Sequence, residues 1–263
     1  MREIKTAIIL CGGKGTRLGE LGKKIPKTLV KIHNKPILWY ILKILKKNKY
    51  NQVILPLGFK GKSIRKFLDR NRIIEDTELV NTGINSNIGK RLFKVSSKIK
   101  SKNFLLLNGD AIFDFNLINI TKKHAKKNND ITFIVSEITY PYGTIGIENN
   151  KIIDFKRNLN YEALKIRGKK KYTAFNYSGM TIINKKKFIA KIKNFKNSYN
   201  FEKDFFPFFI KNYSSNYVGL KGFWHSVDNK KDIDMVNNKK YSSHKYKIIN
   251  IIKNKCLKID KNE

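Results

Sequence analysis

The chain has 263 residues, of which 41% are hydrophobic, so it can bury a sizeable core and is not a disordered chain. Because no apolar run approaches the roughly 18 residues that span a bilayer, and MREIKTAIIL lacks a signal-peptide cleavage site, we expect a cytoplasmic protein without a membrane span. The formal net charge is +36, but only eight of the 56 basic residues are Arg and the Lys are spread along the chain, which argues against a dedicated nucleic-acid surface.

Short apolar runs alternate with segments of helical period through the first half of the chain. In the segment 36–48, for example, isoleucines and leucines recur at helical spacing. This alternation predicts βαβ units and an α/β fold, with a Rossmann-like, doubly wound and mostly parallel sheet. We expect strands at 4–10, 52–57, 77–81, 103–108 and 131–137, and helices at 36–48 and near 61–69, 88–99 and 116–127.

The pattern changes after Tyr140, where shorter strands are separated by turns. This predicts a small antiparallel extension to the sheet, followed by two helices, within a single domain over 1–240. Residues 158–173 lack periodicity and indicate a lid or excursion, and the lysine-rich tail 241–263 is expected to be helical. The expected strands are 144–148, 151–155 and 174–183, and the expected helices lie near 185–192 and 201–212.

The loop LCGGKGTRLGE, residues 10–20, follows the first strand and is rich in glycine. It lacks the Gly-Lys-Ser/Thr of a Walker A loop, and Leu18 stands where a dinucleotide fingerprint has its third glycine. Successive backbone N–H groups in such a loop can point at phosphate oxygens. Arg17 adds a forked cation, and Lys27 follows a stiffening proline. Because NGD at 108–110 also follows a strand, the loop and Asp110 should meet at one edge of the sheet.

Several segments in order resemble the sugar-phosphate nucleotidyltransferase family. They cover roughly residues 4–240, and they are most similar to its glucose-1-phosphate cytidylyltransferase branch. The resemblance implies that the chain joins a nucleoside triphosphate to a sugar 1-phosphate and releases pyrophosphate, with Mg²⁺ as cofactor. The segments are GGKGTRL, PK, KPIL, VNTGINSNIGKRLFKV, FLLLNGDAIFD and GFWHSVDNKKDID.

The resemblance also assigns roles to particular residues. Within 1–140 it implies nucleotide binding, with Arg91 reading a pyrimidine carbonyl, and within 141–240 it implies sugar-phosphate and metal binding. Arg17 and Lys27 are the implied catalytic residues, and Glu202 is a candidate for the sugar hydroxyls. The implied sets are Leu10, Gly12, Gly13, Gly15, Thr16, Arg17, Lys27, Thr82, Gly83, Arg91 and Asp110 for the nucleotide, Lys156, Arg157, Tyr177 and Gly179 for the sugar phosphate, and Asp110 and Asp228 for the metal.

Three departures from the family pattern affect substrate preference. Asn158 stands where the family has a second lysine, so Lys156 or Arg157 would have to hold the sugar phosphate. Asn81 replaces an aspartate, and Lys90 replaces a glycine beside Arg91. The link between FLDR at 67–70 and ELVNTG is also shorter than in the cytidylyltransferases. A related enzyme acting on another phosphorylated sugar is therefore compatible with the sequence.

The sequence is also compatible with functions outside cytidylyl transfer. The chain could be a uridylyl-, thymidylyl- or guanylyltransferase, a nucleotide-binding module without turnover, or a nucleic-acid-binding protein.

The two cysteines of the chain, Cys11 and Cys256, are too few for a disulfide framework or a zinc cluster. A homo-oligomer is compatible with the sequence, and a role in lipopolysaccharide or other surface-glycan synthesis is an expectation from the family alone.

Overall fold

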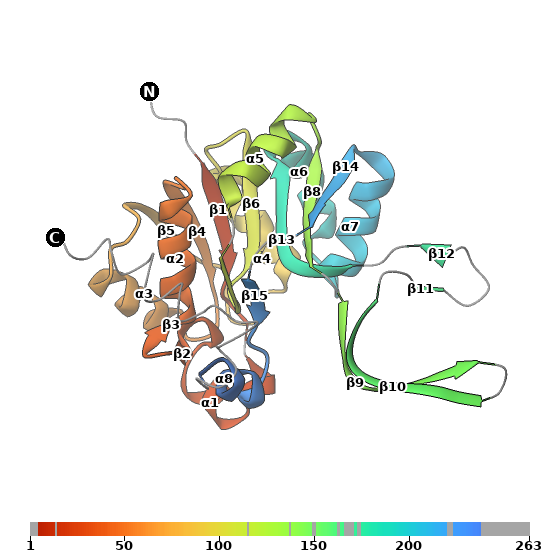
Figure 1. Cartoon of the computed structure of the whole chain (residues 1–263). Coiled ribbons are helices and arrows are strands. Elements are labelled where there is room, and N and C mark those ends of the chain that lie inside the picture. Colours follow the sequence, from red (N-terminus) through yellow and green to blue (C-terminus); the bar gives the residue numbers. More distant parts are fainter. Residues whose placement is uncertain are drawn as a thin grey trace.

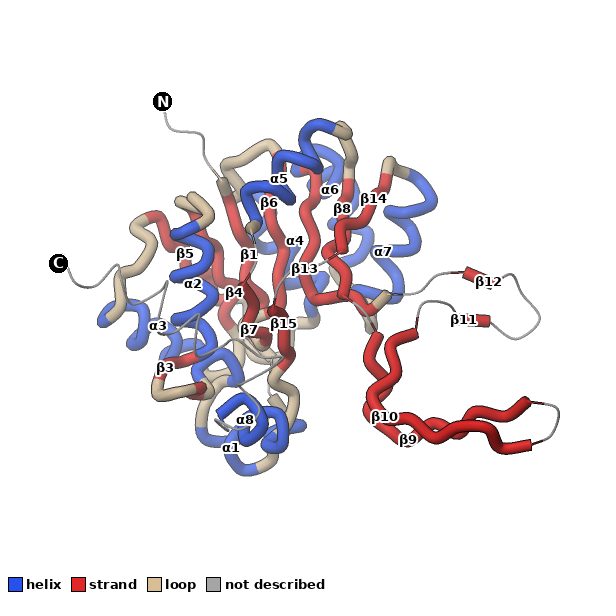
Figure 2. The backbone as a smooth tube through the Cα atoms, in the orientation of Figure 1, coloured by secondary structure: helices blue, strands red, loops and turns tan. Residues whose placement is uncertain are grey.

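A seven-stranded sheet with helices on both faces forms the centre of the protein (Figures 1 and 2). The computed structural model describes residues 5–13, 15–114, 116–136, 138–148, 151–161, 164–165, 171–172, 175–219 and 223–237. The sheet contains β1 (Thr6–Leu10), β4 (Gln52–Leu57), β5 (Asp76–Asn81), β6 (Asn103–Asn108), β8 (Ile131–Ser136), β13 (Asn176–Asn184) and β14 (Ser215–Gly219).

The strand order is β14-β8-β13-β6-β1-β4-β5. β1 is parallel to β4 and β6, β4 is parallel to β5, and β8 is parallel to β14. β13 alone runs antiparallel, between β6 and β8. The predicted mostly parallel, doubly wound sheet is therefore confirmed, and its carboxyl edge is where ligands bind in such folds.

The helices lie on both sides of this sheet. They are α1 (Glu20–Lys24), α2 (Ile37–Lys47), α3 (Gly61–Arg70), α4 (Ile88–Val95), α5 (Leu117–Lys126), α6 (Lys185–Ile192), α7 (Phe201–Asn212) and α8 (Lys230–Asn237), with short 3-10 turns at Thr16–Leu18, Lys27–Leu29, Ser96–Lys98 and Lys193–Phe195.

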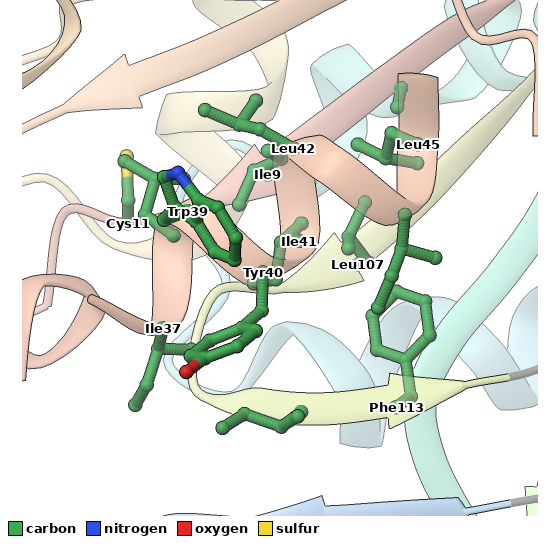
Figure 3. Close-up of a cluster of buried hydrophobic side chains, with 14 of the residues drawn as sticks. Ile9, Cys11, Ile37, Trp39, Tyr40, Ile41, Leu42, Leu45, Leu107 and Phe113 are labelled. Atoms are coloured by element: carbon green, nitrogen blue, oxygen red, sulfur yellow. The ribbon is translucent and has the colours of Figure 1, made fainter. Parts of the chain in front are cut away.

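Two hydrophobic clusters lie on opposite faces of the sheet, each between the sheet and the helices that cover that face. Successive strand residues point to opposite faces, so Ile9 belongs to a cluster with residues of α2, α3 and α5, whereas Ile8 belongs to a cluster with residues of α4, α6 and α7. Figure 3 shows the first cluster, in which Tyr40 and Ile41 of α2 lie near Leu107 and Phe113. The aromatic run at 205–210 supplies Phe205, Phe206 and Phe209 to the second cluster.

Asparagine begins four of the helices. The side chains of Asn87, Asn116, Asn184 and Asn200 each accept a hydrogen bond from the backbone N–H three residues later. An N-cap of this kind satisfies one of the donors that a helix start leaves unpaired. Asn116 therefore begins α5, whereas Asp114, two residues earlier, ends the strand β7 (Ala111–Asp114).

Small antiparallel pairs of strands lie outside the main sheet. Of the region 158–173, predicted as a lid without periodicity, residues 158–161 continue β10 instead. The tail predicted at 241–263 lies outside the described residues. Among the described helices, none is both long and apolar enough to cross a membrane. The pairs are β2 (Lys31–Ile32) with β3 (Lys35–Pro36), β7 (Ala111–Asp114) with β15 (Phe223–Ser226), β9 (Ile138–Glu148) with β10 (Lys151–Tyr161), and β11 (Leu164–Lys165) with β12 (Lys171–Tyr172).

Candidate active site

The glycine-rich loop begins where β1 ends. The Leu10 carbonyl accepts a hydrogen bond from the Gly109 N–H at 3.0 Å, which joins this loop to the turn after β6. Gly15 has a φ of +62°, a left-handed conformation that favours glycine. The chain then enters a 3-10 turn in which Thr16 and Arg17 are exposed. The loop therefore presents backbone and polar side chains to solvent beside Asp110.

A lysine lies between two carboxylates at this edge. The Nζ atom of Lys27 lies 2.9 Å from Oδ2 of Asp110 and 2.8 Å from Oδ1 of Asp228. Arg17 reaches the same Oδ1 atom of Asp228 at 3.2 Å, but its side chain is 79% exposed, against 17% for Lys27. We call Lys27, Asp110, Asp228 and Arg17 the charged cluster, and it unites residues that the sequence predicted for catalysis and metal binding.

Backbone contacts hold the two aspartates together. Asp110 lies in the turn between β6 and β7, and its carbonyl accepts a hydrogen bond from the Val227 N–H at 2.9 Å. β15 pairs with β7 immediately before Asp228. The Ser226 hydroxyl donates to Oδ2 of Asp228 at 2.7 Å, and the Asp228 N–H donates to the Asp232 side chain at 2.7 Å. The position of Asp228 is thus fixed by a strand pair before it and a helix start after it.

The pKa values of Lys27 and Asp228 reflect this pairing. Burial acts to lower the pKa of Lys27, but the Asp110 and Asp228 carboxylates outweigh it and raise that pKa. Burial acts to raise the pKa of Asp228, but hydrogen bonds from Lys27 and Ser226 and the positive charges of Lys27 and Arg17 lower it overall. Both groups are therefore charged at neutral pH.

Asp110 and Asp228 together fit a magnesium site. Mg²⁺ usually binds through one or two carboxylates, with phosphate oxygens and water completing an octahedral shell. The Lys27 ammonium, which both carboxylates contact, shows that the two face one region of space and can share a cation there. Among the described residues no group of three His, Cys, Asp or Glu could hold a metal, so a site here would use these two carboxylates and a bound ligand.

Arg91 is placed beneath the glycine-rich loop and is buried. Its guanidinium donates to the backbone carbonyls of Gly12, Leu57 and Ile84 and to the Thr82 hydroxyl. Its donors are thus directed at the protein itself, which differs from the expectation that Arg91 reads a base.

Thr82 and Gly83 lie in the turn that follows β5. Thr82 is buried, and its N–H and hydroxyl both donate to the Leu57 carbonyl, at 2.9 and 2.6 Å. The Gly83 N–H donates to the Asn81 side chain at 3.1 Å. Asn81, which departs from the family pattern, therefore stabilises this turn, and Thr82 joins it to the end of β4.

The opposite side of the charged cluster is formed by α7 and β13. The Glu202 carboxylate contacts Asn108, and its pKa is raised by burial and by the negative charge of Asp110. Gly179 has a φ of +76°, and a Cβ there would lie 2.8 Å from the Asn108 amide nitrogen. Tyr177 turns its hydroxyl to Thr181 at 2.8 Å and packs its ring against Phe206. Gly179 and Glu202 thus lie near the cluster, whereas the Tyr177 hydroxyl is directed into the sheet.

Lys156 and Arg157 are not brought to the charged cluster. They lie in β10, which pairs with β9 as a two-stranded ribbon, and Figure 1 shows this ribbon leading away from the main sheet. Their side chains are not among those described. Their role toward a sugar phosphate stays a prediction.

Asn108 and Ser226 also lie at the site, and neither was predicted from the sequence as a site residue. Asn108 contacts Glu202 and lies against Gly179, and Ser226 donates to Asp228. Each lies two residues before an aspartate of the cluster. A polar residue at the end of an apolar strand, just before a candidate ligand, was the signal available in the sequence.

Comparisons with known proteins show the family to which the chain belongs. A family described as Nucleotidyl transferase matches residues 6–242. The chain is 31% identical over 179 residues to a Bacillus subtilis protein named "Probable glucose-1-phosphate cytidylyltransferase", covering 60% of this chain and 70% of that protein. It is 29% identical over 208 residues to D-glycero-alpha-D-manno-heptose 1-phosphate guanylyltransferase from Aneurinibacillus thermoaerophilus, covering 76% and 82%.

The fold is similar to that of a solved structure as well. HddC from Yersinia pseudotuberculosis superposes with a TM-score of 0.64 at 21% identity, covering 87% of this chain and 96% of that one. At this identity the likeness concerns the fold alone.

Proposed function

Because the chain belongs to the nucleotidyl transferase family and is a sugar-1-phosphate nucleotidyltransferase, we propose that it joins CTP to glucose 1-phosphate. The products are CDP-glucose and pyrophosphate. The observation that carries the proposal is the position of Lys27 between Asp110 and Asp228, beside the glycine-rich loop. The choice of this substrate pair is supported by the name of the Bacillus subtilis relative.

The reaction needs charge neutralisation and positioning more than acid–base chemistry. An oxygen of the sugar phosphate attacks the α-phosphorus in line, and the bond from that phosphorus to the bridging oxygen of pyrophosphate breaks. Both reactants are anions. In the proposal, Lys27 neutralises the α-phosphate, Arg17 binds the β- and γ-phosphates, and the N–H groups of the glycine-rich loop bind phosphate oxygens. The raised pKa of Lys27 keeps its ammonium charged for this role.

We propose Mg²⁺ as the cofactor, held by Asp110 and Asp228. When bound, it supplies positive charge to phosphate oxygens and so stabilises the charge that develops during transfer. Two neighbours of the charged cluster hold these aspartates in place: the Ser226 hydroxyl donates to one oxygen of Asp228, and the Val227 N–H donates to the backbone carbonyl of Asp110.

A second candidate is guanylyl transfer to a heptose 1-phosphate. The Aneurinibacillus relative aligns over a larger share of this chain than the Bacillus one, and Asn81 departs from the cytidylyltransferase pattern beside the predicted nucleotide pocket. We further propose that the reaction takes place in the cytoplasm, where nucleoside triphosphates are supplied, and that its product serves glycan synthesis, such as that of lipopolysaccharide.

The test is a panel that combines CTP, UTP, dTTP, GTP and ATP with glucose, mannose and D-glycero-D-manno-heptose 1-phosphates. Pyrophosphate release is followed with Mg²⁺ present. We expect the largest kcat/KM with CTP and glucose 1-phosphate. A larger value for GTP with the heptose phosphate would select the second candidate, and an absence of pyrophosphate in every combination would refute both.

The metal assignment is tested by replacing Asp110 with Asn. We expect kcat to fall by about two to four orders of magnitude, because one charged ligand is lost. Calorimetric titration of Mn²⁺ with a nucleoside triphosphate present should also show weaker binding. Asp114→Asn is the matched control, since Asp114 ends β7 outside the charged cluster. If Asp110→Asn matched this control in both measurements, the assignment would be wrong.

A further inference from the structure

Arg91 is a buried cation that forms no ion pair with a carboxylate among the described residues. Burial lowers its pKa, and the nearby thiol of Cys11 acts in the opposite direction. A buried charge without a counterion is costly unless polar groups surround it. The charge of Arg91 must therefore be stabilised by neutral polar groups, and those groups lie at the carboxyl edge of the sheet, beside the glycine-rich loop.

The four acceptors of Arg91 come from three separate segments. Nη2 donates to the Gly12 carbonyl at 3.0 Å and to the Ile84 carbonyl at 3.3 Å. Nη1 donates to the Leu57 carbonyl at 3.2 Å and to the Thr82 hydroxyl at 2.7 Å. These acceptors follow or end β1, β4 and β5, so one planar group joins the carboxyl ends of three neighbouring strands.

Two glycines make room for this planar group. A Cβ built on Gly12 would lie 2.2 Å from Nη1 of Arg91, and a Cβ built on Gly58 would also lie 2.2 Å from Nη1. Backbone strain does not explain glycine at either position, because no left-handed φ occurs there. The glycines are thus explained by the guanidinium between them. A lysine has no planar fork and could not reach the same acceptors.

The contact at Gly12 fixes the direction of a donor in the loop. The Gly12 carbonyl accepts hydrogen bonds from Arg91 and from the Phe59 N–H at 3.2 Å. The peptide bond is planar and trans, so the N–H of Gly13 points opposite to that carbonyl. Gly12 is buried and Gly13 is exposed. Holding the carbonyl inward therefore turns the Gly13 N–H outward, into the solvent of the candidate site.

We propose that Arg91 is a positioning residue that fixes the Gly12–Gly13 peptide for phosphate binding and does not select the base. This rests on the proposed function, because it assumes that the loop binds a nucleoside triphosphate. Every nucleoside triphosphate carries the same phosphates. The loss of Arg91 should therefore weaken all of them by the same factor.

The kinetic test compares Arg91→Lys and Arg91→Ala with the wild type, using CTP, UTP and GTP. We expect kcat/KM to fall by about 10- to 100-fold for each nucleotide, mainly through KM, since the phosphate donor loses its fixed direction. The ratios of kcat/KM between the three nucleotides should stay within about 2-fold of the wild-type ratios. Arg91→Lys should lose as much activity as Arg91→Ala, because lysine lacks the planar fork. A change of 10-fold or more in those ratios would assign base selection to Arg91 and overturn the proposal.

A second test needs no activity and so separates this inference from the proposed function. Gly58→Ala places a methyl group where the guanidinium lies, and it should lower Tm by about 4 °C in the wild type. In the Arg91→Ala background the same methyl should change Tm by less than about 1 °C, because the space is empty. Gly219→Ala is the control, since a Cβ there meets nothing within 4 Å.

Additive effects of Gly58→Ala and Arg91→Ala would contradict the placement of the guanidinium between the glycines. If the wild type proved inactive with every substrate while this coupling was present, the proposed function would fail and the placement of Arg91 would stand. Binding of CTP followed by calorimetry would then decide the role. An unchanged CTP affinity in Arg91→Ala would overturn the positioning role.

Discussion

Lys27 and Arg91 lie at the same edge of the sheet, but they are held in different ways. Lys27 contacts two carboxylates, which can take up protons or bind a metal ion. Arg91 contacts neutral carbonyls and a hydroxyl, which neither carry a charge nor take up protons in the physiological range. The first arrangement can exchange its partners when substrates arrive, and the second cannot. At this edge, Lys27 is therefore placed to change partners during the reaction, whereas Arg91 keeps its contacts and holds the backbone in place.

The largest expected effect comes from removing the exchangeable cation. Lys27→Ala should lower kcat by about 1,000-fold, because the α-phosphate loses its neutralising charge during transfer. Lys23→Ala is the matched control, since Lys23 is an exposed lysine that pairs with the exposed Glu20. Steady-state kinetics of both variants would measure the effect. Equal activity of the two variants would show that the reaction does not use Lys27.

The next largest expected effect is on the free energy of unfolding and concerns His124, a buried histidine away from this edge. Burial lowers the pKa of His124 to about 4, and its Nδ1 atom lies 2.8 Å from the Thr132 hydroxyl. An unfolded histidine has a pKa of about 6.5, so below that pH only the unfolded chain takes up the proton. The free energy of unfolding should therefore fall by about 3 kcal/mol between pH 6.5 and 4.

The contribution of His124 is isolated by comparing the wild type with His124→Gln in urea at several pH values. The difference between the two proteins should shrink as the pH falls through this window and stay constant above pH about 7. A constant difference from pH 4 to 8 would mean that His124 titrates normally. His124 would then give no evidence for burial of an uncharged ring.

The smallest expected effect is the change in Tm caused by Arg17→Ala. This side chain is 79% exposed and pairs with one oxygen of Asp228, and exposed pairs of this kind contribute little. Arg17→Ala should leave Tm unchanged within about 1 °C, while kcat/KM for the nucleotide falls by about 10- to 50-fold, through loss of a phosphate contact. A clear loss of Tm with unchanged kinetics would assign Arg17 a structural role.

Local sequence patterns predicted the strands and helices that position the site. The strands at 52–57 and 103–108 and the helix at 201–212 match β4, β6 and α7 residue for residue. Their apolar runs and turn residues are contained in the segment itself. The meeting of the glycine-rich loop with Asp110 was expected because both follow predicted strands of one sheet. The addition of Asp228 was expected from the family resemblance alone, because no local pattern places a residue so distant in the chain beside them.

The roles of Arg91 and Asp114 could not be predicted in this way. An arginine near a nucleotide pocket suggests contact with a ligand, but its direction depends on the space left by Gly12 and Gly58. Asp114 resembles a helix cap in the sequence, yet pairing of β7 with β15 extends the strand to that residue. Both cases depend on segments that are distant in the sequence and adjacent only in the fold.

The pairing of β15 with β7 also determines when the charged cluster can form. Residues up to Gly219 include all seven strands of the main sheet, together with Lys27 and Asp110. Asp228 follows later in the chain, and its contact with Lys27 spans 201 positions. During synthesis the sheet can therefore assemble before Lys27 has its second carboxylate. A chain that ends before Asp228 therefore lacks the second carboxylate of the charged cluster, and it also lacks Ile233 and Val236 of the first hydrophobic cluster.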